Sequence, residues 1–219
     1  MEQVAKKTNS LTKASSRAVA PETSILDVMA AFANSSNGGG FEGSRLKFSK
    51  GEFFAGDNQE EVEIGTRFLA DIRSTEHGSV VWVNNRPDAS NMVNLLSGEI
   101  PKPRSALGFD DRSQWELDMN NQPRDPVQAT MSLDFYPVDL GRPTTRADRL
   151  HFSTTSVGGM NAIKKLIGEY VQHARMNGGD KCKLSPVVEL RVSSYQHSNK
   201  AYGRIKNPEF KIVEWVPTE

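Results

Sequence analysis

A long amphipathic pattern in the C-terminal third of the chain constrains its fold more than any other feature. Apolar residues recur there with the period of an α-helix: Ile163, Leu166, Ile167, Tyr170, Val171 and Ala174. The hydroxyl side chains of residues 153–156 could cap the start of this helix, and Asn177-Gly178-Gly179 would end it. Residues 150–154 are β-prone. The sequence therefore predicts a strand that leads directly into one amphipathic helix.

Two more strands are predicted after the helix. Residues 187–192 follow Pro186 as a run of β-formers, and residues 210–216 alternate between apolar and polar side chains. The segment between them interleaves aromatic and basic residues, as a hairpin-like turn would. A helix placed after a first group of strands and before a final pair is the element order of an OB barrel. We therefore predict a mainly β fold with one long helix, an OB-fold-like antiparallel barrel.

The first group of strands is predicted from alternating segments earlier in the chain. These segments are residues 45–54 with a kink at Gly51, 64–72, 79–84, and 128–138 with Ala129, Met131, Leu133 and Phe135 on one side. His77-Gly78 is expected to form the turn between the second and third strands.

Residues 86–127 are rich in proline and are predicted to form a long loop insertion. A loop of this length inside a compact domain is often functional. Helical turns are expected within it at 91–97 and at 109–116, and Asp110 or Asp111 would cap the second.

The N-terminal residues have a different character. Residues 1–20 are polar and aperiodic, and we predict that they are disordered. Ile25, Val28, Met29 and Phe32 form the stripe of a short amphipathic helix, and the Gly-rich residues 34–40 form a flexible linker. We therefore divide the chain into a tail, residues 1–40, and a barrel domain, residues 41–219. The helix at 25–32 could pack on its own domain, or dock on a second copy of the chain or another protein.

Composition narrows the class of protein. The only cysteine, Cys182, excludes an internal disulfide and a multi-thiolate metal site. There is no apolar run of about 18 residues, so no membrane span is expected. Residues 1–20 lack the apolar segment of a secretory signal, so the cytoplasm is the expected compartment.

The net charge is zero, but the charge is unevenly distributed along the chain. Residues 50–139 contain 8 Lys and Arg against 16 Asp and Glu, and residues 140–211 contain 13 against 5. A basic C-terminal part could face a polyanion, or the two parts could attract each other. Ordinary solvated surface would explain the same counts.

The best candidate for a binding site is an aromatic and basic set near the C-terminus. It comprises Tyr195, His197, Lys200, Tyr202, Arg204 and Lys206. Single-strand binding without sequence preference needs rings on which bases stack and cations that neutralise phosphates, and an alternating hairpin would supply both. Trp82, Arg86, Trp115 and Arg124 could extend this surface. The alternative is a solvated hairpin whose tyrosines pack on their own sheet.

Other chemistry is less well supported by the sequence. The acidic residues of the insertion could hold a divalent metal in a nuclease, or could serve as loop charges and helix caps: Asp110, Asp111, Glu116, Asp118 and Asp125. Ser156-Val157-Gly158-Gly159 lacks the P-loop and dinucleotide-binding spacings. The histidines have no metal-binding spacing, and no Ser nucleophile motif is present. We therefore predict no catalytic residue, metal or cofactor.

Several short motifs resemble those of a family of poorly characterised bacteriophage and prophage proteins. They are Gly65-Thr66-Arg67-Phe68, Trp82, Arg86-Pro87, Leu107-Gly108, Asp111 with Trp115-Glu116, Arg124-Asp125-Pro126, Ser156 with Gly158-Gly159, Tyr195-Gln196-His197 and Tyr202-Gly203-Arg204-Ile205. The resemblance covers roughly residues 45–215. It implies a phage context, in which OB-fold single-strand-binding proteins are common. The expected compartment is then the cytoplasm of the host cell. Val127 departs from the pattern, because an aromatic residue is expected after Asp125-Pro126.

Together these observations favour a phage-type single-stranded DNA-binding protein that acts in DNA replication or recombination and is not an enzyme. It could form a homo-oligomer. The alternative is a protein–protein interaction or structural phage module, with a partner bound through the segment from Ile25 to Phe32. A metal-dependent nuclease is a third hypothesis.

Overall fold

The computed structural model describes residues 43–84, 86–118, 121–138 and 144–217. The predictions for the tail, its short amphipathic helix and its linker lie outside the described residues. Within the described ranges the strands are β1 (Ser44–Ser49), β2 (Glu52–Ala55), β3 (Glu60–Val62), β4 (Arg67–Val83), β5 (Arg86–Asn94), β6 (Val127–Pro137), β7 (Leu150–Thr154), β8 (Leu184–Gln196) and β9 (Arg204–Pro217). The long helix is α2 (Val157–Met176). Short 3₁₀ helices are η1 (Arg104–Leu107), η2 (Arg112–Gln114), η3 (Arg146–Asp148), η4 (Gly179–Lys181) and η5 (Lys200–Tyr202).

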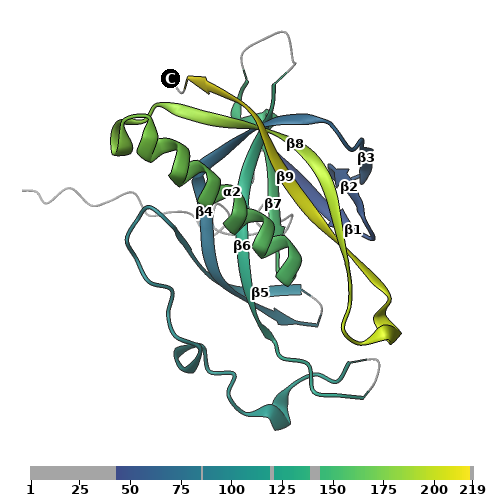
Figure 1. Ribbon diagram of the computed structural model, residues 1–219. Coiled ribbons are helices and arrows are strands. Elements are labelled where there is room, and N and C mark those ends of the chain that lie inside the picture. The colour runs from purple at the N-terminus through teal and green to yellow at the C-terminus, as the bar shows by residue number, and fades with distance from the viewer. Residues whose placement is uncertain (1–42, 85, 119–120, 139–143, 218–219) are drawn as a thin grey trace, which may run out of the picture. The chain divides into compact units, whose positions relative to one another are not determined.

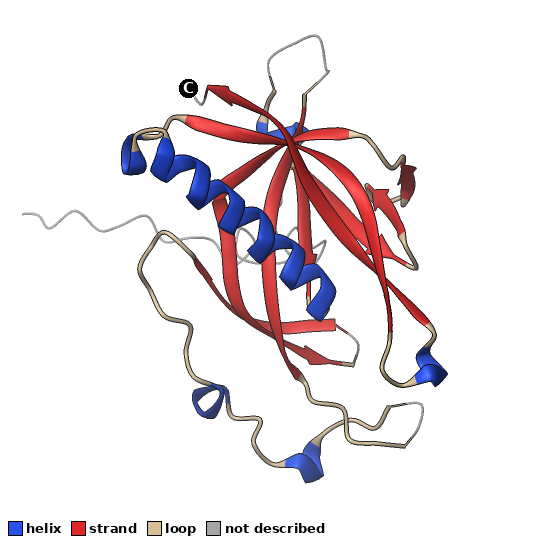
Figure 2. Cartoon of the chain, in the orientation of Figure 1, coloured by secondary structure: helices blue, strands red, loops and turns tan. Residues whose placement is uncertain are grey.

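The strands form one curled sheet with the order β3-β2-β1-β7-β6-β4-β8-β9, and β5 pairs with β4. Figure 1 shows α2 lying across the sheet, and Figure 2 shows the half-barrel that the strands make around it. Among the described strands, β1 and β7 pair in parallel and the other neighbours are antiparallel. The predicted mainly β, OB-like barrel with one long helix is confirmed.

The core of the half-barrel is centred on Phe210 of β9, which is 3% exposed. Its ring centroid lies 4.9 Å from that of Phe135 on β6, 5.3 Å from Phe152 on β7 and 6.4 Å from Phe53 on β2. The helix closes this core with Ile163 and its neighbours, which are fully buried. Strands that are far apart in the sheet order are therefore joined through one aromatic side chain.

The helix forms where its periodicity predicts it. Ser156 is the N-cap, and its side chain accepts a hydrogen bond of 3.0 Å from the backbone N–H of Gly159. A side chain at Gly159 would clash, because its Cβ would lie 2.4 Å from Oγ1 of Thr154. Asn177 is the C-cap. The helix therefore begins tightly packed against the end of β7.

The expected kink at Gly51 is a hairpin turn. Lys50 and Gly51 have φ angles of 54° and 95°, and these two residues connect β1 to β2. Two-residue turns with positive φ at both positions match the twist of antiparallel strands. The single strand predicted at 45–54 is therefore wrong, because the chain reverses at Lys50 and Gly51.

The turn predicted at His77-Gly78 is also wrong. These residues lie inside β4, which runs for 17 residues and merges two predicted strands. A Cβ on Gly78 would lie 2.0 Å from the backbone oxygen of Asn91 on β5. The glycine is there because a neighbouring strand approaches closely, and not because the chain turns.

The loop insertion is shorter than predicted. Residues 86–94 form β5, so the helical turn predicted at 91–97 is wrong. The turn predicted at 109–116 is confirmed as η2, with Asp111 as its cap. Of the four residues predicted to share one side of β6, Met131, Leu133 and Phe135 are buried, whereas Ala129 is exposed.

We predict that Phe210→Ala lowers the free energy of unfolding by about 3–5 kcal/mol, because it removes the ring that joins three strands and leaves a cavity. Urea unfolding followed by circular dichroism measures this. Val213→Ala on the same strand is the control, since Val213 is 41% exposed and its truncation should change stability by less than about 0.5 kcal/mol. Equal losses in the two variants would contradict a core centred on Phe210.

Candidate nucleic-acid interface

The predicted aromatic and basic set lies on a protruding β-hairpin. Strands β8 and β9 stay paired to Gln196 and Arg204, and η5 closes the turn between them. Asn199 caps η5 by accepting a hydrogen bond from the N–H of Ala201. Gly203 has a φ of 64°, which a glycine adopts without strain. We call residues 195–206 the hairpin tip.

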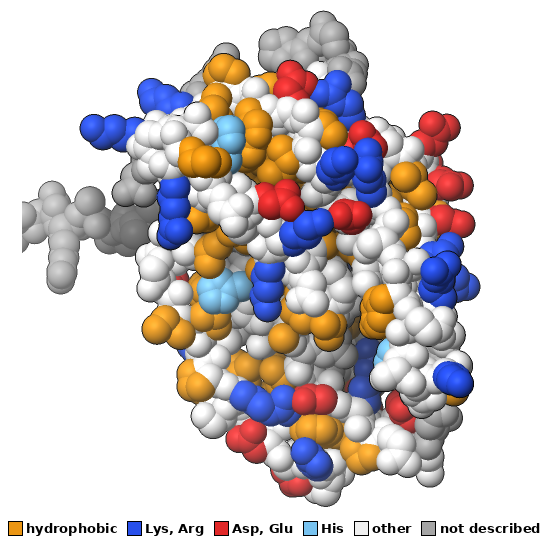
Figure 3. All heavy atoms as spheres, in the orientation of Figure 1, with side chains coloured by type: hydrophobic (Ala, Val, Ile, Leu, Met, Phe, Trp, Pro, Cys, Tyr) orange, Lys and Arg blue, Asp and Glu red, His pale blue; other side chains and the backbone are white. Residues whose placement is uncertain are grey.

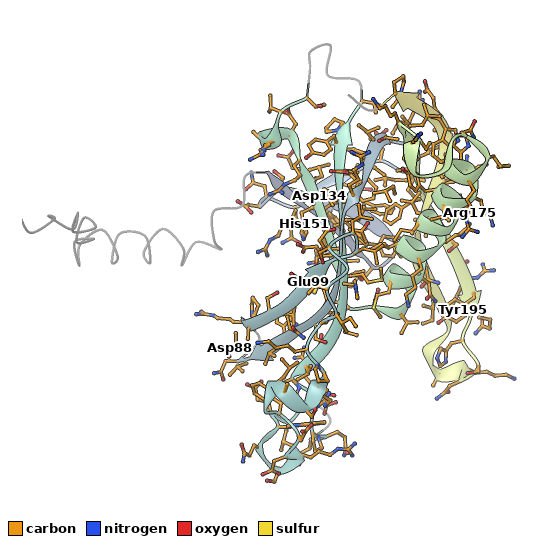
Figure 4. All side chains as sticks on the ribbon, turned by 90° about the vertical axis from the view of Figure 1, so that its left-hand side faces the viewer. Asp88, Glu99, Asp134, His151, Arg175 and Tyr195 are labelled. Atoms are coloured by element: carbon orange, nitrogen blue, oxygen red, sulfur yellow. The ribbon has the colours of Figure 1, made fainter. Side chains whose placement is uncertain are left out.

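One face of the hairpin tip presents rings. Tyr195 is 50% exposed and pairs directly with Ile205 across the strands. The ring of His197 lies 6.5 Å from that of Tyr195, tilted by 39°. Figure 4 shows Tyr195 on the hairpin, well away from the side chains of the core. The predicted alternative, in which the tyrosines pack on their own sheet, therefore does not hold for Tyr195.

The other face of the hairpin tip presents cations. Lys206 pairs with Ser194, and Arg204 pairs with Gln196. Successive side chains of a strand point to opposite faces, so both cations lie on the face that continues from Phe210. The rings and these cations therefore lie on the same hairpin but on its two opposite faces.

Two further members of the set lie in the turn. Lys200 is exposed at the start of η5. The backbone of Tyr202 ends η5, and the side chain of Tyr202 lies outside the described part of the chain.

The second predicted group gathers on another part of the molecule. Trp82 and Arg124 line one small pocket together with Glu116 and Pro126, and the backbone of Arg86 pairs with that of Val83 beside Trp82. Nε1 of Trp82 is buried and has no hydrogen-bond partner among the described residues. Figure 4 shows this arm, which β4, β5 and the insertion form, projecting from the same end of the barrel as the hairpin but on the opposite side.

Trp115 is held by its own loop. Its indole N–H donates to the backbone oxygen of Phe109 at 3.0 Å, and the guanidinium groups of Arg104 and Arg112 lie 5.3 and 5.4 Å from its ring centre. Arg104 also donates two hydrogen bonds to Asp125, at 2.6 and 2.9 Å. The ring therefore helps to organise the insertion, and its role as a base contact stays a prediction.

The acidic residues of the insertion have structural partners. Asp110 pairs with Arg104, Asp111 caps η2, Glu116 accepts from the N–H of Asn84, and Asp118 accepts from the N–H of Gln122. Burial alone would raise the pKa of Asp125, but hydrogen bonds from Arg104 and the backbone of Val127 outweigh it, so this pKa lies below its ordinary value. No group of three or more His, Cys, Asp or Glu residues in the described ranges could hold a metal ion.

A polar cluster that the sequence patterns do not predict is formed by Asp71, Asp134, Arg149 and His151. Asp134 is only 7% exposed, and its carboxylate lies 2.7 Å from Nδ1 of His151 and 3.4 Å from Nη1 of Arg149. Figure 4 labels Asp134 and His151 together in the body of the sheet. The one signal in the sequence was a charged residue between two core positions, Leu133 and Phe135.

Ser74 joins an irregular part of β4 to β6 beside the polar cluster. The backbone N–H of Asp134 donates to Oγ of Ser74, and that hydroxyl donates to the backbone oxygen of Asp71. The register of β4 against β6 shifts between Asp71 and Glu76. Ser74 therefore connects β4 to β6 beside the shift in register.

The charge asymmetry along the chain does not produce two charged areas on the face drawn in Figure 3. Acidic and basic side chains are interspersed there. An ion pair also joins the two parts of the chain, between Arg149 and Asp134.

Comparisons with protein-family models, with curated proteins and with solved structures found no match. The resemblance to phage proteins therefore stays a prediction. None of the helices in the described ranges combines the length and the apolar character that crossing a membrane requires.

We predict that Asp71→Asn stabilises the protein at about pH 7. Burial raises the pKa of Asp71 and the charge of Asp134 raises it further, against backbone hydrogen bonds that lower it. The ionised carboxylate is thus unfavourable in the folded state, and this penalty disappears as the pH falls below the ordinary pKa of the group. Urea midpoints of variant and wild type should differ at about pH 7 and converge near about pH 3.

Asp88→Asn is the matched control, because Asp88 is exposed on β5. This variant should unfold like the wild type at both pH values. A destabilised Asp71→Asn protein at neutral pH would show that the carboxylate supports the fold, contrary to the prediction.

Proposed function

We propose that this protein binds single-stranded DNA through the hairpin tip and catalyses no reaction. The observation that carries the proposal is the half-exposed ring of Tyr195 on a protruding hairpin whose Lys200, Arg204 and Lys206 form no ion pair with a carboxylate of the described residues. The ring of Tyr195 could stack on a base, and the cations could neutralise phosphates. Binding of a single strand requires both.

The ring face supplies the stacking. Tyr195 is half exposed, Ile205 lies beside it across the strands, and His197 extends the surface toward the turn. Every base has a flat face, so such a platform accepts any sequence. One stacked base would contribute about 1–3 kcal/mol.

The lysines and the arginine of the hairpin tip supply the positive charge. Lys200, Arg204 and Lys206 form no ion pair with a carboxylate of the described residues. Closer to the core on the same two strands, Arg191 pairs with Glu189, and Glu209 pairs with Lys165 of α2. Positive charge at the end of the hairpin is thus available to a polyanion.

The separation of rings and cations favours a single strand over a duplex. An unpaired base can swing away from its backbone, so a strand that crosses the tip could place a base on Tyr195 and a neighbouring phosphate near Arg204. A base held in a duplex cannot turn outward without losing its pairing and stacking. The hairpin would therefore select flexible strands.

A role in DNA replication or recombination in the cytoplasm of a phage host follows from the resemblance of the sequence to phage proteins. The curled sheet fits this role, because OB barrels bind oligonucleotides. Fold alone does not fix function, so the proposal depends on the hairpin tip.

We predict that the protein binds a short fluorescent oligo(dT) and that binding weakens steeply between about 50 and 200 mM salt. Tyr195→Ala should weaken binding by about 5- to 150-fold, the equivalent of one lost stacked base. Fluorescence anisotropy measures both effects.

Tyr195→Phe is the control, because it keeps the ring and should bind within about twofold of the wild type. The proposed function would be contradicted if wild-type protein did not bind oligo(dT) at low salt, or if it bound oligo(dT) equally at both salt concentrations.

A further inference from the structure

Lys206 reaches from the β8–β9 hairpin to the turn between β1 and β2. A Cβ built on Gly51 would lie 2.1 Å from Cδ of Lys206 and 2.8 Å from its Nζ. The side chain of Lys206 therefore lies directly against the backbone of Gly51. Two hairpins that are 155 positions apart in the sequence meet at this point.

The residue before Gly51 adds a second cation to this junction. Lys50 is exposed in the turn, adjacent in sequence to the glycine that Lys206 covers. Neither lysine forms an ion pair with a carboxylate of the described residues. Positive charge that no described carboxylate neutralises is available to an anion at this junction.

We propose that Lys50 and Lys206 together bind one phosphate of the nucleic-acid backbone, so that the β1–β2 turn is part of the binding surface. This inference rests on the proposed function and extends it to a second hairpin. The ligand is a phosphodiester of a single strand, which two ammonium groups would hold by charge-assisted hydrogen bonds.

The position of the junction also sets a path for the strand. Tyr195 lies on one face of the hairpin, and Lys206 lies on the other, toward β1 and β2. A strand with a base on Tyr195 would cross the tip past Arg204 and reach the junction with a later phosphate. The two hairpins thus hold successive parts of one strand.

Gly51 positions Lys206 in this arrangement. A side chain at Gly51 would occupy the space that the stem of Lys206 fills, and its φ of 95° is unfavourable for other residues. Gly51 therefore allows the backbone conformation of the turn and also leaves space for the side chain of Lys206.

The test measures oligo(dT) affinity against salt concentration for Lys50→Asn, Lys206→Gln and the double variant. Asparagine suits the positive φ of position 50, so the turn should be retained. Each single variant should reduce the slope of log K against log salt by about 0.7, the value for one phosphate of a single strand. Because the lysines share that phosphate, the slope of the double variant should fall little further.

Lys183→Gln is the matched control. Lys183 is exposed and immediately precedes β8, at the end of the strand farthest from the hairpin tip. The Lys183→Gln substitution removes the same charge and should leave the slope of log K against log salt unchanged. Circular dichroism and thermal unfolding check that each variant is folded.

The possible results separate this inference from the proposed function. If Tyr195→Ala weakens binding but Lys50→Asn behaves like the Lys183 control, the shared phosphate site is wrong while single-strand binding stands. Slope losses that add in the double variant would assign the lysines to two phosphates and also overturn the inference. A duplex that binds as tightly as oligo(dT) and responds equally to both variants would overturn its single-strand assignment. Wild-type protein without affinity for oligo(dT) would overturn the proposed function itself.

Discussion

The packing of Phe210 against rings from three other strands is the contact on which the described structure depends. These strands, β2, β6 and β7, lie at different places in the sheet order, so the sheet must curl for their rings to meet. Burial of this aromatic cluster drives the curl, because aromatic side chains carry much of the apolar area that folding removes from water. The helix then covers the remaining apolar face through Ile163 and Leu166.

The same packing fixes the position of the proposed binding surface. Phe210 anchors β9 in the core, and the strand continues outward to Lys206 and Arg204 without a change of register. Strand alternation then decides which side chains share the core-facing side of the hairpin. The curl also brings β2 close to β9, which is why Lys206 can lie on Gly51. A hydrophobic constraint in the core thus organises charge at the surface.

The sequence predicted features that depend on local periodicity and not those that depend on register or on long-range contacts. The helix from Val157 to Met176 and the two strands after it follow from short-range patterns. Strand β5 was missed because it is largely exposed and has no apolar alternation. Spacing alone could not show that Tyr195 and Lys206 lie on opposite faces, because a shift of one residue in pairing reverses every side chain. No local signal could reveal the contact between Lys206 and Gly51.

The most direct test of the account is photo-crosslinking of the protein to an oligonucleotide in which iododeoxyuridine replaces thymidine. Such a base reacts with an aromatic side chain that it contacts, and peptide mass spectrometry locates the adduct. We expect the adduct to form mainly on Tyr195 and added salt to reduce its yield. Adducts confined to residues outside the hairpin tip, or no adduct with oligonucleotide at low salt, would contradict it.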